Sequence, residues 1–142
     1  MNLAPYILIV ALCGPVAPDA AYTVAPGHTI GIDIARLVGD YNRDHRVDEA
    51  DFLLWQQGYP GLYSGADFLN WQLNFGSHVE LTSVSHPRQG VVDIDFPGGW
   101  VDYTAPDHEC AAIIIYGVCD GGVDEDAFTF GTIAINVRGE SE

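Results

Sequence analysis

Short segments with strand-like patterns lie on both sides of the middle of the chain. Toward the N-terminus, AYTVAPGHTIGIDI (21–34) alternates apolar and polar residues with a period of two. Beyond residue 76, Gly, Pro and Asp turns separate five further strand candidates: HVELTSVSHP, GVVDIDF, GWVDYTAP, AAIIIYGV and GTIAINV. Several short strands with turns at this spacing are typical of two packed sheets. We therefore expect a mainly β protein, an antiparallel two-sheet β-sandwich.

The segment VVDIDF shows most clearly which side chains should face the core. Val92, Ile94 and Phe96 share one face of the predicted strand, while Asp93 and Asp95 share the other. Successive side chains of a strand point to opposite faces of the sheet. We expect the three apolar residues to face the core and both aspartates to face solvent.

The middle of the chain contains an internal repeat with a different period. ADFLLWQQGY (50–59) and ADFLNWQLNF (66–75) are identical at six of ten positions, at an offset of 16 residues. Each copy has an apolar stripe at helical spacing, formed by Phe52, Leu53, Trp55 and Tyr59 in the first and by Phe68, Leu69, Trp71 and Phe75 in the second. We expect a helical hairpin inserted between strands, with the aromatic side chains of these stripes packed between its helices.

The ends of both predicted helices have recognisable signals. Asp48 can cap the first helix with Asp51 three residues further on, and Ser64 can cap the second in the same way. Gly58 and Gly76 are positioned to end the two helices.

The charge of the chain is strongly unbalanced. It contains 20 Asp and Glu residues against five Arg and no Lys, for a formal net charge of −15, while 48% of its residues are hydrophobic. Such a surface repels nucleic acid and anionic lipid, so we expect neither nucleic-acid binding nor membrane insertion. It suits the binding of hard cations.

Two further features bear on the environment of the chain. Cys110 and Cys119 flank one predicted strand, which would place their Cα atoms roughly 30 Å apart, too far for a disulfide. Residues 1–18 contain an apolar stretch without the usual positive flank, and they are interpreted as either an export signal or a linker.

The stretch DYNRDHRVDEAD (40–51) places oxygen-bearing side chains at a regular spacing. Counted from its first residue, it has candidate ligands at positions 1, 3, 5, 9 and 12 and a backbone carbonyl at position 7, the spacing of a 12-residue calcium loop. In the same order these are Asp40, Asn42, Asp44, Asp48, Asp51 and the carbonyl of Arg46. Val47 at position 8 is a small apolar anchor, and a helix follows directly. The alternative interpretation is a solvated acidic turn.

Two positions differ from an ordinary calcium loop. His45 occupies position 6, where Gly usually adopts the left-handed conformation, and position 12 is Asp51 instead of the longer Glu. We expect a single Ca²⁺ site of modest affinity, micromolar or weaker.

The loop, the following FLLWQQG and the second GADFLNWQLNFG together resemble a bacterial type I dockerin over about residues 39–76. The resemblance implies calcium binding by the six residues named above. The second dockerin loop is missing, so only one calcium ion is implied. The positions that would correspond to a cohesin-contact surface are Glu49, Ala50, Gln56 and Gln57.

The flanking segments resemble a bacterial cadherin-like, immunoglobulin-type repeat. The similarity lies in the first strands and in two signatures, Tyr-Thr-x-Pro at Tyr103–Pro106 and Tyr-x-Val-x-Asp-Gly at Tyr116–Gly121. It implies an Ig-like β-sandwich interrupted by the dockerin-like unit. The expected division is 19–38 for the first strands, 39–76 for the calcium-loop hairpin and 77–142 for the remaining strands.

Other chemistries have weaker signals. The five histidines are scattered without metal-ligand spacing, so we interpret them as surface or turn residues. No nucleophile elbow, phosphate loop or zinc cluster is present in the sequence, and we predict that the chain is not an enzyme.

Together these features predict an extracellular calcium-binding module, structural or protein-interacting, of a bacterial surface or secreted protein. Its partner would be another protein, cohesin-like or not, or neighbouring modules of a longer chain. The alternatives are a metal-free adhesion or spacer repeat and an accessory dockerin-type module of a polysaccharide-degrading enzyme.

Overall fold

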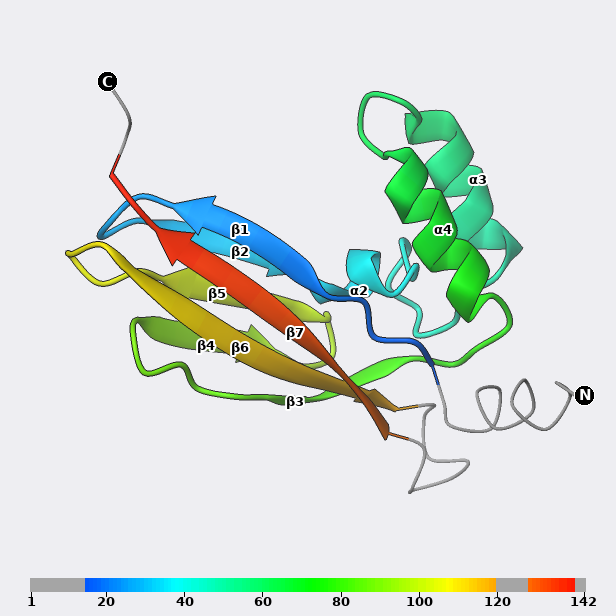
Figure 1. Cartoon of the computed structure of the whole chain (residues 1–142). Coiled ribbons are helices and arrows are strands. Elements are labelled where there is room, and N and C mark those ends of the chain that lie inside the picture. The colour runs from blue at the N-terminus through cyan, green and yellow to red at the C-terminus, as the bar shows by residue number, and fades with distance from the viewer. Residues whose placement is uncertain (1–14, 120–127, 140–142) are drawn as a thin grey trace, which may run out of the picture.

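The computed structural model describes residues 15–119 and 128–139. Its strands form two sheets (Figure 1). One sheet has the order β1-β7-β6-β3, with β1 at Ala20–Val24, β7 at Phe128–Val137, β6 at Cys110–Cys119 and β3 at Glu80–Val84. The other has the order β2-β5-β4, with β2 at Thr29–Asp33, β5 at Trp100–Thr104 and β4 at Val91–Asp95. The prediction of a mainly β, two-sheet protein is confirmed.

The pairings are antiparallel with one exception. β1 lies parallel to β7, with Ala20 opposite Ile133. Alternating patterns do not specify strand direction, because both directions expose the same face of each strand. The parallel pair was therefore not predicted.

Both sheets contribute to one hydrophobic core. Ile114, Tyr116 and Ile133 of the first sheet and Val101 and Tyr103 of the second are fully buried in the same cluster. Fully burying side chains of this size contributes about 1.5–3 kcal/mol each relative to leaving them exposed. The core therefore joins the two sheets into one unit.

Strand β4 follows the predicted alternation only within its own bounds. Val92 and Ile94 pack against the core, and Asp93 and Asp95 are exposed. Phe96 is 41% exposed, since it follows the end of the strand and lies in a turn. The expectation that Phe96 faces the core is wrong.

The helical unit lies between β2 and β3 in the sequence and beyond one end of the sheets in space (Figure 1). A short helix, α2 (Ile34–Leu37), leads into it, and α3 (Glu49–Gly58) and α4 (Gly65–Asn74) form the hairpin. Both predicted capping boxes are present, the Asp48 box at α3 and the Ser64 box at α4. Gly58 is the last residue of α3, and Gly76 has a φ of +85° just beyond α4.

Aromatic side chains join the two helices. Phe52 lies 5.1 Å from Trp71 and Trp55 lies 5.0 Å from Phe68, measured between ring centroids. Such pairs add about 0.5–1.5 kcal/mol each beyond the burial of their area. Tyr59 and Phe75 are 50% and 52% exposed, so the prediction that they pack between the helices is wrong. Leu53 and Leu69 of the same apolar stripes are also exposed, at 54% and 57%.

A fully buried asparagine fastens α4 to the rest of the fold. The amide oxygen of Asn74 accepts a hydrogen bond from the N–H of Val16 at 2.6 Å. Its amide nitrogen donates to the carbonyls of Val16 and Val38 at 2.8 and 2.9 Å. Asn74 and Val38 are buried, whereas Val16 is partly buried, so the Val38 carbonyl depends most on this side chain for a hydrogen bond.

We expect Asn74→Ala to lower the free energy of unfolding by about 2–4 kcal/mol, because it removes the partner of the buried carbonyl of Val38 and of the partly buried N–H and carbonyl of Val16. Urea unfolding followed by circular dichroism measures the effect. The control is Gln72→Ala on the exposed side of the same helix, expected within about 0.5 kcal/mol of wild type. Equal stabilities of the two variants would contradict the anchoring role.

Several other sequence-based expectations concern positions outside this core. Cys110 and Cys119 lie at opposite ends of β6 as free cysteines, as predicted. The interpretation of residues 1–18 falls mostly on residues 1–14, which are outside the described residues. The end of the Tyr116–Gly121 signature is outside them as well.

Candidate metal centre

The acidic stretch forms a loop between α2 and α3. Its entrance requires Gly39, which has a φ of +91°, and a Cβ there would lie 2.7 Å from the Cα of Trp71. Val47, the predicted apolar anchor, is fully buried in the core cluster. The loop is therefore fixed at both its entrance and its middle.

Three of the predicted ligands converge. Carboxylate oxygens of Asp40, Asp44 and Asp51 lie within 4.8 Å of one another, although four and seven residues separate them in sequence. Asp40 and Asp51 are 2% and 0% exposed, whereas Asp44 is open to solvent. This cluster can hold a metal ion, as the loop spacing predicted.

Asp40 is costly to ionise in this environment. Burial raises the pKa of its carboxyl to about 7, and the neighbouring charges of Asp51 and Asp44 add to the increase. Two backbone N–H groups oppose it: His45 donates to Oδ2 at 2.9 Å and Asp44 to Oδ1 at 3.2 Å. These donors carry no net charge, so they offset the burial only in part.

Asp51 is also costly to ionise, and it has a second role at the start of α3. Burial raises its pKa to about 6 despite N–H donors from Asp48 at 2.9 Å and Asn42 at 3.1 Å. The bond from Asp48 belongs to the capping box that begins α3. The same carboxylate therefore connects the acidic cluster to the start of the helix.

The other predicted ligands, Asn42, Asp48 and the carbonyl of Arg46, are not part of this three-carboxylate cluster. The side-chain oxygen of Asn42 accepts from the N–H of Asp44 at 3.3 Å. Asp48 accepts from the N–H of Ala50 at 3.1 Å as the helix cap. The N–H of Arg46, whose carbonyl is the position-7 candidate, donates to Asp44 at 2.9 Å.

The backbone of the loop turns through two left-handed residues. His45 has a φ of +69°, which confirms the conformation predicted for position 6. Arg43 has a φ of +60°, which the loop spacing does not predict. The Arg43 guanidinium donates hydrogen bonds to the Asp33 carboxylate at 2.6 Å and to the Gly98 carbonyl at 2.8 Å. These bonds hold the loop against the second sheet.

The predicted interaction positions lie together on α3. Glu49, Ala50, Gln56 and Gln57 are all exposed. The two helices also expose Leu53, Leu69 and Leu73, and the link between them exposes Leu62; each is more than half accessible.

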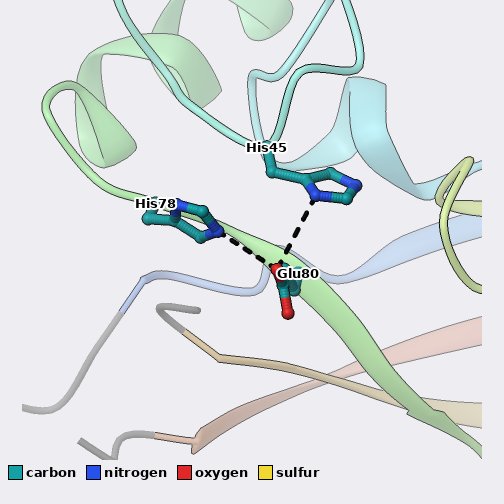
Figure 2. A group of neighbouring side chains, drawn as sticks. All are labelled: His45, His78 and Glu80. Carbon is teal, nitrogen blue, oxygen red and sulfur yellow. Dashed lines mark hydrogen bonds and ion pairs between the residues drawn. The ribbon is translucent and has the colours of Figure 1, made fainter. Parts of the chain in front are cut away.

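The histidines are not all isolated from one another, although the sequence shows no metal-ligand spacing among them. Figure 2 shows His45 of the loop and His78 of the segment before β3 on either side of Glu80. One ligand atom from each lies within 4.8 Å of the others. The two histidines are separated by 32 residues in the sequence, and only the folded backbone brings them together.

This chain is similar to known proteins over only part of its length. A comparison with known protein families finds no match. Two curated proteins are similar, each named L-cysteine:1D-myo-inositol 2-amino-2-deoxy-alpha-D-glucopyranoside ligase, from Frankia alni and Frankia casuarinae. Both are 36% identical over 80 residues, covering 52% of this chain and 17% and 16% of the respective relative. The chain thus spans less than a fifth of these relatives.

These matches correct one prediction. The interpretation of the chain as not an enzyme is contradicted, because the two similar proteins are both named as enzymes. Among the described residues, no helix is long and apolar enough to cross a membrane.

Proposed function

We propose that residues 40–51 bind one Ca²⁺ and that this ion orders the helical hairpin of an extracellular bacterial module. The observation that carries the proposal is the pair of buried carboxylates, Asp40 and Asp51, facing the exposed carboxylate of Asp44. Buried charges of one sign are stabilised when a cation is placed among them. The residues present therefore fit a cation.

The chemistry of the donors favours calcium. The cluster and the surrounding candidates offer carboxylate, amide and carbonyl oxygens, the ligands of hard cations. Asp51 is too short to bind as an ordinary position-12 Glu does, which supports modest affinity. Calcium sites of extracellular modules work in the range of about 10⁻⁴–10⁻³ M. Such affinity fits a surface or secreted protein.

The proposed ion acts through Asp51. Neutralising its carboxylate lets the same residue complete the capping box of α3 without an unpaired buried charge. Trp71 of α4 donates its indole N–H to the carbonyl of Asp48 at 2.8 Å, so the start of α3 is also linked to α4. Calcium would in this way fix both helices relative to the sheets.

An ordered hairpin would present a surface to a protein partner or to a neighbouring module. Glu49, Ala50, Gln56 and Gln57 form its polar part, and the exposed leucines Leu53, Leu69 and Leu73 supply apolar area. The resemblance to a dockerin within a cadherin-like, Ig-type sandwich supports this role. A metal-free spacer is the alternative that the test must separate.

Hydrogen exchange measured by mass spectrometry tests the ordering. Adding calcium to the chelator-treated chain is expected to slow exchange in 40–58 and to leave 91–104 unchanged. Asp44→Ala should abolish the protection, whereas Asp93→Ala, an exposed aspartate on β4, should retain it. Equal exchange of 40–58 with and without calcium would instead support the metal-free spacer.

The ligase matches support a second candidate, in which this chain contributes to an enzyme. The supporting observation is the 36% identity over 80 residues. Incubation of the chain with ATP, L-cysteine and the amino sugar named for those relatives, followed by mass spectrometry of the products, tests it; ATP supplies the activation that joining a carboxylate to an amine requires. A ligated product would support this candidate, and its absence would leave the calcium-dependent role as the better account.

A further inference from the structure

The geometry points to a second metal site, formed by His45, His78 and Glu80, that binds a divalent transition metal of the Zn²⁺ type (Figure 2). Imidazole nitrogens suit zinc, whereas calcium takes oxygen ligands. The site therefore differs in chemistry from the three-aspartate cluster, although His45 belongs to the same loop. It does not depend on calcium binding for its ligands.

Backbone hydrogen bonds hold the ligands in place. The N–H of Val79 donates to the carbonyl of His45 at 2.8 Å, and the N–H of Val47 donates to Ser77 at 2.9 Å. Arg46 and His78 form an antiparallel β-bridge between these bonds. The two histidines thus extend from paired backbone segments, and Glu80 begins the strand that follows.

The distances between ligand atoms suit one small cation. His78 Nε2 lies 3.2 Å from Glu80 Oε1, and His45 Nδ1 lies 3.7 Å from the same oxygen. In a tetrahedral zinc site with bonds of about 2.0–2.2 Å, neighbouring ligand atoms are about 3.3–3.6 Å apart. Small side-chain adjustments would bring all three atoms to that spacing.

The hydrogen bond of His45 Nε2 shows which ring nitrogen, Nδ1, is available to bind a metal ion. Its Nε2 lies 2.8 Å from the carbonyl of Pro97, and a carbonyl only accepts, so Nε2 donates. In the neutral ring, Nδ1 then directs a lone pair toward the Glu80 carboxylate. A cation between these two acceptors removes their repulsion. Metal-binding histidines usually donate their other N–H to a carbonyl in this way.

The site is open to ions from solution. The side chains of His45, His78 and Glu80 are 33%, 34% and 42% exposed. Three protein ligands leave a fourth position for water. The competing explanation is a metal-free ion pair, in which His78 donates Nε2–H to Glu80.

Zinc titration against a chromogenic chelator distinguishes these explanations. With excess calcium present, the wild-type chain is expected to bind one Zn²⁺. His78→Ala and Glu80→Gln are each expected to weaken zinc binding about 10-fold or more. The matched control is His86→Ala, an exposed histidine outside the group, which should bind like wild type.

Nitrogen-detected NMR of the imidazoles provides a second readout on the wild-type protein. Zinc should shift Nδ1 of His45 and Nε2 of His78, while Nε2 of His45 keeps its proton. Equal zinc binding by wild type and both ligand variants, or imidazole shifts spread over all histidines, would overturn the site.

Asp44→Ala separates this inference from the proposed calcium site. The variant should keep zinc binding, because Asp44 is not among the three zinc ligands. Loss of zinc binding in Asp44→Ala together with its retention in His78→Ala would place the zinc in the acidic cluster and overturn the inference. Failure of calcium binding alone would leave the zinc result unaffected.

Discussion

Replacing Asp40 with asparagine is expected to make the metal-free chain more stable and to remove its response to calcium. Without a cation, the buried carboxylate has a pKa of about 7 against an ordinary 3.8, so ionising it at pH 8 weakens the fold. One pKa unit corresponds to about 1.4 kcal/mol, and after the partial loss of hydrogen bonding we expect a gain of about 1–3 kcal/mol. The wild-type chain should instead gain about 3 kcal/mol from calcium at 100 times its dissociation constant.

Urea unfolding at pH 8, with chelator and with excess calcium, measures both effects. Glu49→Gln is the matched control, since it removes an exposed carboxylate beside the cluster and should leave both values within about 0.5 kcal/mol of wild type. A metal-free Asp40→Asn chain that is less stable than wild type and still responds to calcium would contradict the role assigned to Asp40.

Raising the pH should lower the stability of the metal-free chain and raise its affinity for calcium. Burial raises the folded-state pKa of Asp40 to about 7 and of Asp51 to about 6, both above the ordinary 3.8. The folded state therefore binds protons more tightly than the unfolded state between about pH 4 and pH 7. Stability without metal should fall as pH rises through this window.

Calcium must displace those protons, so its affinity should rise over the same window, on the order of 1,000-fold between pH 5 and pH 8. Thermal unfolding at a series of pH values, with chelator and with calcium, measures the two trends. Asp40→Asn should flatten the metal-free curve. A metal-free chain whose stability increases steadily from pH 5 to pH 8 would show that the two carboxylates are not buried as charged groups.

Local patterns were sufficient for most of the fold and for the acidic cluster. The period of two located the strands because each strand has one buried face, and the signals at Asp48 and Ser64 located both helix starts. Convergence of Asp40, Asp44 and Asp51 followed from spacing, since the ligands of such a loop are close in sequence. These features depend on neighbouring residues only.

Features that depend on distant contacts were missed. His45 and His78 meet because the backbone of 45–47 pairs with that of 76–79, which no local pattern encodes. In the sequence Asn74 looks like an ordinary polar helix residue, yet it is buried and hydrogen-bonded to the backbone of Val16 and Val38. The exposure of Tyr59 was missed for the same reason.

Calorimetric titration of the chelator-treated chain with calcium tests the central claim most directly. The account predicts one saturable site of micromolar or weaker affinity, accompanied by an increase in helical circular dichroism, and no such site in Asp44→Ala. Absence of binding heat up to millimolar calcium, or equal binding by Asp44→Ala, would contradict it.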